Sequence, residues 1–223
     1  MKPVVRKPLF LSLAVLLYAM FATVVPSCAA DPGAAASSRP DAQPAAPTAP
    51  VAAPPQVFVE DARLPDQYGL ALDYGYVFDP SPDRTFVLAR GFAIYDYGTV
   101  WHQANCPNSL RFKIEGAIGS TVTPSGDLMA SANILAMKYP LGVKGKLRPY
   151  GEAGIGVIYT RFKVVGEGLH FNFNPLLGLG LELPRQDGKN IFAAVRLHHI
   201  SNGGLDHDNR GVNSVVLQVG RIF

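Results

Sequence analysis

The stretch that decides the fold is YGLALDYGYVF, residues 68–78, in which every second residue is large and apolar. Successive side chains of an extended chain point to opposite sides, so one face of this segment carries only aromatic and leucine side chains: Tyr68, Leu70, Leu72, Tyr74, Tyr76 and Phe78. The other face is mainly small and carries Asp73. Such a pattern predicts a strand that turns one face to lipid and the other to a narrow barrel interior.

The same alternation recurs along the rest of the chain. About eight segments of roughly ten residues show it, and clusters of Gly, Pro, Asp and Asn separate them. They are residues 68–78, 84–97, 110–122, 127–139, 146–160, 169–183, 190–201 and 213–223. Aromatic residues gather at segment ends, and the last segment closes on Phe223, as is typical of outer-membrane barrels. We therefore predict an all-β fold, an eight-stranded antiparallel transmembrane β-barrel over residues 57–223, in a bacterial outer membrane.

Other all-β architectures fit the polar faces less well. A soluble β-sandwich would carry an outer face rich in Lys, Glu and Thr, whereas charged residues make up only 17% of this chain. An open pore is not expected, because about eight strands leave an interior that side chains just fill. We expect the charged residues of the inward faces to pair in that interior: Arg196, Glu115, Glu152 and Glu182. His198 is expected to point inward and to bond to Glu152 or Glu182.

The N-terminal part predicts export. Basic residues within the first seven positions precede an apolar stretch from Leu9 to Val25, which a run of small residues follows. We predict a signal peptide over residues 1–30, cleaved after Ala30; an uncleaved anchor, or a lipoprotein acylated at Cys28, stays open. Residues 31–56 are almost entirely Ala, Pro, Ser and Asp, which predicts a disordered linker.

The densest polar motif lies near the C-terminus, in RLHHISNGG, residues 196–204. The apolar parity of its segment continues into His199 and Ser201, and that of the last segment includes Asn213, so we expect all three on the outer wall. With both chain ends on the periplasmic side, they would lie at the extracellular rim, where the abundant esters belong to outer-leaflet lipid. A hydroxyl two residues from an imidazole on one strand face is about 6 to 7 Å away, near enough for nucleophilic activation.

The His-x-Ser-Asn sequence at residues 199–202, with a glycine-rich turn behind it, resembles the PagL-type lipid A 3-O-deacylases. The resemblance spans the barrel loosely and the last thirty or so residues specifically. It implies an eight-stranded barrel that hydrolyses the ester-linked acyl chain at the 3-position of lipid A, with His199 as general base and Ser201 as nucleophile. It also implies an oxyanion site at Asn202, to which we add backbone N–H groups near Gly203.

Asn213 departs from the family's pattern, because the family has an acidic residue twelve positions after the serine. A carboxylate fixes the imidazole tautomer and stabilises the imidazolium, whereas an amide only orients the ring. Asp206 or Asp208, in the preceding loop, is an alternative acid. Two other functions also stay open: a catalytically silent barrel with a structural role, and a barrel that binds lipid A without cleaving it.

The partners follow from this chemistry. Serine-based ester hydrolysis requires no cofactor, and we expect no metal site, because His198 and His199 fall on opposite faces of one strand. The expected partners are lipid A of lipopolysaccharide and the outer-membrane bilayer. No nucleic acid is expected, since the sequence has no basic cluster of that kind. Whether the barrel forms a homodimer stays open.

Overall fold

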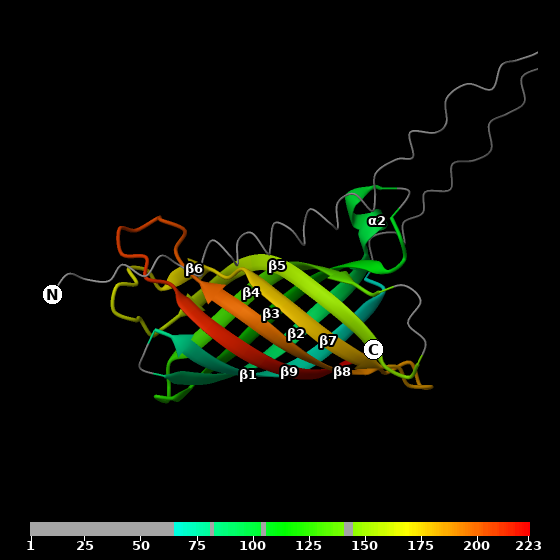
Figure 1. Ribbon diagram of the computed structural model, residues 1–223, viewed down its shortest axis with the longest axis horizontal. Coiled ribbons are helices and arrows are strands. Elements are labelled where there is room, and N and C mark those ends of the chain that lie inside the picture. The colour runs from blue at the N-terminus through cyan, green and yellow to red at the C-terminus, as the bar shows by residue number, and fades with distance from the viewer. Residues whose placement is uncertain (1–64, 81–82, 104–105, 141–144) are drawn as a thin grey trace, which may run out of the picture.

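The computed structural model describes residues 65–80, 83–103, 106–140 and 145–223. The predicted signal peptide and linker lie outside the described residues. What is described is a closed antiparallel β-barrel whose strands run obliquely around the wall (Figure 1).

The barrel consists of strands joined mostly by short connections. They are β1 (Gln67–Asp79), β2 (Arg84–Asp96), β3 (Leu110–Thr123), β4 (Leu128–Lys138), β5 (Arg148–Thr160), β6 (Phe171–Phe173), β7 (Leu176–Leu183), β8 (Ile191–Ile200) and β9 (Val212–Ile222). All strand pairs are antiparallel, and sequential strands pair except that β6 and β7 both pair with β5. Pairing of β1 with β9 closes the sheet. A short helix, α2 (Tyr97–Trp101), lies in the β2–β3 connection.

Strands β6 and β7 together occupy one position in the wall. Both pair with β5, and the register of Phe173 on β5 continues into Leu176. Pro175 lies between them, and proline has no N–H to donate to a ladder. The predicted sixth segment is therefore one strand interrupted at the proline, and the predicted eight-stranded antiparallel barrel is confirmed.

The alternation also predicts the correct faces. Leu70 and Leu179 are 62% and 68% exposed on the outer wall, whereas Asp73 and Glu115 are 1% and 2% exposed in the interior. An apolar outer wall around a polar interior is the arrangement that a lipid bilayer stabilises. No helix in the described ranges is long and apolar enough to cross a membrane.

The interior is layered. Three cations and three carboxylates meet near mid-barrel, with side chains at most 2% exposed: Arg90, Lys113, Arg196, Asp73, Glu115 and Glu152. One apolar cluster around Phe86 and Ile158 lies on one side of this charge network, and another around Tyr150 and Phe192 lies on the other. Equal numbers of opposite charges allow so many buried groups to stay ionised and paired.

Two details of the predicted interior are wrong. Glu182 lies apart from the charge network and accepts hydrogen bonds from Tyr139 Oη at 2.7 Å and Asn190 Nδ2 at 2.6 Å. His198 does point inward, but its Nε2 has no partner within the described ranges, so it bonds to neither predicted glutamate. Parity places a side chain inside the barrel, whereas its height along the axis depends on strand tilt and register.

The two ends of the barrel differ. The end where β1 and β8 finish and β9 begins is called the site end below. Helix α2 and the C-terminus lie at the opposite end, at the right of Figure 1. The helix was not among the predicted elements; Asp96 caps it by accepting a hydrogen bond from Thr99 N at 2.8 Å.

Candidate active site

Ser201 is held at the site end by backbone pairing. Strand β8 ends at Ile200, but Ser201 N donates to Phe173 O at 3.1 Å and Phe173 N donates to Ser201 O at 2.8 Å. These bonds extend the β8 ladder by one residue onto β6. The serine is half-buried and sits two positions beyond His199 on a chain that is still extended.

His199 and Asn213 face each other across two neighbouring strands. They are direct partners in the β8–β9 register. The ring Nδ1 of His199 lies 2.7 Å from Oδ1 of Asn213. The structure therefore brings together two of the three residues that the sequence predicted to share the outer face, His199 and Asn213.

Asp79 was not predicted and continues the same line. It is the β1 partner of Asn213, just past a register irregularity that begins at Val77. Asn213 Nδ2 donates to Asp79 Oδ2 at 3.0 Å, and Arg210 Nη2 donates to Asp79 Oδ1 at 2.7 Å. We call Asp79, Asn213 and His199 the rim row; it crosses β1, β9 and β8 in order. The β1–β9 register, with its irregularity, is a long-range property that local sequence patterns do not encode.

His199 is only 9% exposed, although its parity points outward. The backbone of Gly211 covers the ring: a Cβ at that position would lie 2.9 Å from His199 Cε1. Gly211 has φ +73°, a left-handed conformation that glycine adopts without cost. Its N–H donates to Glu167 Oε2 at 3.1 Å, so the 161–170 connection helps to hold the cover in place. A shielded imidazole is screened from bulk water, which strengthens its hydrogen bonds.

Asn202 is fully buried and holds the 201–211 loop together. Its Nδ2 donates to Asp208 O at 2.8 Å and to Glu167 Oε1 at 3.4 Å, and its Oδ1 accepts from Gly204 N at 2.9 Å. Between these residues Gly203 is exposed, with φ +66°. Its N–H has no acceptor in the part of the chain that the structure describes. A backbone donor is therefore free next to Ser201, whereas the Asn202 amide is engaged within the loop.

The alternative acids do not join the rim row. Asp206 Oδ1 accepts from Asp208 N at 2.9 Å, and the exposed Asp208 side chain lies 3.5 Å from His207. Neither carboxylate bonds to Asn213. Within the described ranges, no group of three or more His, Cys, Asp and Glu side chains is placed to hold a metal ion.

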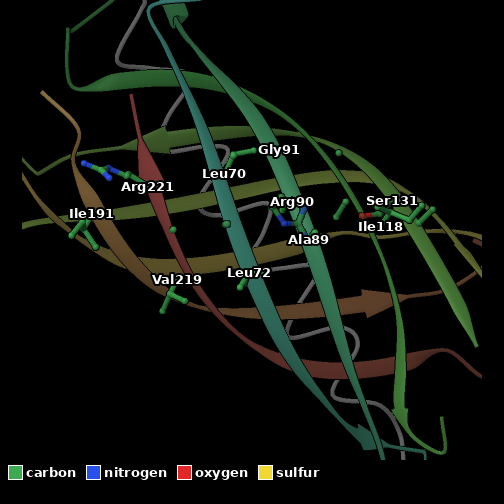
Figure 2. A pocket seen from close by; sticks show the side chains of 15 residues that line it. Leu70, Leu72, Ala89, Arg90, Gly91, Ile118, Ser131, Ile191, Val219 and Arg221 are labelled. Carbon is green, nitrogen blue, oxygen red and sulfur yellow. The ribbon is translucent and has the colours of Figure 1, made fainter. Parts of the chain in front are cut away.

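A shallow apolar hollow in the outer wall lies away from the rim row. In Figure 2 the small residues Ala89 and Gly91 of β2 lie among the larger Leu70, Leu72 and Ile118 of the flanking strands. No residue of the rim row lines the hollow. On a membrane-facing wall such a hollow is open to lipid tails.

The fold and the rim row together define a class, a small β-barrel of the bacterial outer membrane with a polar row that ends in a histidine at one rim. The chain belongs to the lipid A 3-O-deacylase (PagL) family, whose model matches residues 67–221. The family that the sequence resembles and the outer-membrane location are thus confirmed.

The chain is also similar to several solved structures. Neisserial surface protein A is similar at 14% identity and a TM-score of 0.53, over 70% of this chain and 94% of that one. The outer-membrane enzyme PagL gives 21% identity and a TM-score of 0.46, over 68% of this chain and 97% of that one. The N-terminal barrel domain of Pseudomonas aeruginosa OprF gives 15% identity and a TM-score of 0.45, over 71% of this chain and 98% of that one. No curated protein matches the sequence.

Proposed function

We propose that this barrel hydrolyses the ester-linked acyl chain at the 3-position of lipid A, with Ser201 as nucleophile and His199 as general base. Membership of the lipid A 3-O-deacylase family supports the substrate. The observation that carries the assignment of the base is the 2.7 Å contact between His199 Nδ1 and Asn213 Oδ1. An amide oxygen only accepts hydrogen bonds, so Nδ1 carries the proton and Nε2 presents a lone pair.

The proposed reaction follows the acyl-transfer scheme. Ser201 Oγ attacks the ester carbonyl carbon while His199 Nε2 takes the hydroxyl proton. The negative charge that develops on the carbonyl oxygen is bound by backbone donors, with the Gly203 N–H as the first candidate. Asn202 contributes to this oxyanion site by holding the turn that presents Gly203. The tetrahedral intermediate then expels the 3-oxygen of lipid A, which takes the proton from His199.

Water completes the cycle. His199 deprotonates a water molecule, the water oxygen attacks the acyl-serine carbonyl, and the fatty acid leaves as Ser201 regains its proton. The outward face of the rim row supports an ester that arrives from the bilayer rather than from the barrel interior. We place the site end at the cell surface, where lipid A resides.

The test is mass spectrometry of lipid A from cells that express the full chain or the variants Ser201→Ala and His199→Ala. We expect one ester-linked acyl mass to be lost with the native chain and retained with both variants. Ser120→Ala is the matched control, because Ser120 is an exposed serine on the outward face of β3. Heat-modifiable gel mobility checks that every variant is inserted and folded. Deacylation by a folded Ser201→Ala variant would show that Ser201 is not the nucleophile.

A lipid-binding barrel without turnover is the second candidate, and the amide at Asn213 favours it. An amide in place of the catalytic acid costs about 10⁴-fold in rate in the serine protease example, partly because the tautomer is wrong. Unchanged lipid A in cells that contain a folded native barrel would favour this candidate. In that case the native chain should still bind lipid A, and Ser201→Ala should leave binding unchanged.

A further inference from the structure

We infer that Asp79 is a positioning residue for the proposed reaction: it orients the Asn213 amide, and the amide in turn fixes the tautomer of His199. This inference rests on the proposed function. The carrying observation is the continuous rim row, in which Asn213 donates to Asp79 at 3.0 Å on one side and faces His199 Nδ1 at 2.7 Å on the other.

The amide of asparagine has two ends with opposite hydrogen-bonding character. If Oδ1 of Asn213 faces the ring, Nδ1 of His199 must carry the hydrogen, and Nε2 carries the lone pair that can take the serine proton. If Nδ2 faces the ring, Nδ1 must accept, and Nε2 carries the hydrogen. The second arrangement gives a histidine that cannot act as the base for Ser201. A glutamate at this position would have no donor end, so the choice arises from the asparagine itself.

Asp79 removes the choice. An ionised carboxylate only accepts hydrogen bonds, so it pairs with the Nδ2 end of Asn213 and repels the Oδ1 end. A hydrogen bond to a charged group favours one orientation of the amide over the other roughly ten- to a hundredfold. With Nδ2 held toward β1, Oδ1 must point across β9 to His199. The side chain of Asp79 thus sets the protonation pattern of the His199 ring through Asn213.

Arg210 completes the arrangement. It donates to the second oxygen of Asp79 at 2.7 Å, which fixes the plane of the carboxylate and compensates its charge. The carboxylate of Glu167 binds the N–H of Gly211, whose backbone lies against the His199 ring. Glu167 therefore acts on the cover over the ring, whereas Asp79 acts on Asn213.

The first experiment measures the tautomer directly. Nitrogen-15 NMR of the full chain, labelled at histidine and refolded in lipid, should show His199 with its hydrogen on Nδ1. Asp79→Asn and Asp79→Ala should populate the Nε2–H form, whereas Asp127→Ala should not. Asp127 is the matched control, because it is an aspartate at the same rim that faces Arg84 at 3.7 Å and does not touch Asn213. An unchanged His199 tautomer in both Asp79 variants would overturn the inference.

The second experiment measures turnover of lipid A by the same proteins. Asp79→Ala should lower kcat about twofold and leave KM unchanged, because loss of the ten- to hundredfold preference leaves about half of the His199 rings with the hydrogen on Nδ1. Adding Asn213→Asp to Asp79→Ala should restore much of kcat, because the new carboxylate accepts directly from Nδ1. Failure of this rescue in a folded variant would also count against the inference. If the native chain is inactive but His199 carries its hydrogen on Nδ1, the proposed function is wrong. The effect of Asp79 on the His199 tautomer would still be supported.

Discussion

Two polar clusters use the same strand, β8, and they are built differently. Arg196 on the inward face reaches Glu115 on β3 and Glu152 on β5, because inward side chains of all strands converge on the barrel axis. His199, three residues further along on the outward face, contacts Asn213 on the adjacent β9. Outward side chains diverge, so a site on the wall can recruit partners only from neighbouring strands.

This difference predicts how each cluster responds to amino-acid substitution. In the interior charge network every group except Asp73 has at least two partners of opposite charge, so the network contributes to the stability of the whole barrel. The rim row is a line in which Asn213 contacts one residue on either side, so a change at Asp79 can reach His199 through Asn213. Damage inside should therefore change stability, and damage at the rim should change turnover.

The largest expected effect comes from Arg196→Met. This change leaves the buried Glu115 and Glu152 short of a cation, and loss of one partner of a buried ion pair costs about 3–5 kcal/mol. Urea unfolding of the lipid-refolded barrel, followed by heat-modifiable mobility, measures it. Adding Glu152→Gln should recover part of the loss, because it removes the uncompensated charge.

Arg221→Met is the matched control for this prediction. Arg221 lies on the outer wall, pairs with Asp187 at 3.3 Å, and is 45% exposed at its side chain. Exposed pairs contribute about 0–1 kcal/mol, so the unfolding midpoint should barely move. Equal midpoints for the Arg196 and Arg221 variants would show that the interior charge network does not stabilise the barrel.

Much of this comparison is readable from the sequence. The alternation in residues 68–78 predicts a membrane strand with Asp73 inside, and parity in β8 predicts Arg196 inside and His199 outside. These predictions succeed because the side-chain period of a strand is two and is set locally. Other features depend on strand register and tilt, which several strands set together. These are the position of Glu182 along the barrel axis, the interruption of the ladder at Pro175 and the contact of Asp79 with Asn213.

Two glycines of the 201–211 loop allow the effect of a contact with His199 to be separated from the effect of backbone strain. Gly211 and Gly204 both have positive φ, +73° and +85°, in the same loop. A Cβ at Gly211 would lie 2.9 Å from His199 Cε1, whereas a Cβ at Gly204 would meet nothing within 4 Å. Both alanine variants should lose about 1 kcal/mol or slightly more of stability from the left-handed backbone. Gly211→Ala should in addition lower deacylation at least tenfold, because it displaces the base.

The control is built into this pair, since backbone strain is common to both variants and contact with His199 is not. Rates of lipid A deacylation by the two purified variants should therefore differ, while their urea midpoints agree. Equal rates would mean that the cover over His199 has no part in turnover.

The smallest expected effect belongs to Glu167→Gln. Glu167 is 7% exposed, and its carboxylate accepts from Gly211 N and from Asn202 Nδ2. Glutamine keeps one acceptor but turns an NH₂ group toward the other donor, so one buried donor loses its acceptor at a cost of about 1–3 kcal/mol. The effect on the position of His199 is smaller, because the backbone of Gly211 is also held by strand β9, which follows it.

We therefore expect deacylation to fall roughly fivefold in Glu167→Gln, a rate effect of about 1 kcal/mol, and the free energy of unfolding to fall by about 1–3 kcal/mol. Asp208→Asn is the control, because its side chain is 67% exposed and meets only its loop neighbour His207. It should leave the rate unchanged, which would also exclude Asp208 as the missing acid. A loss of stability as large as that of Arg196→Met, with deacylation unchanged, would instead mean that Glu167 holds the barrel together and has no part in holding the base in place.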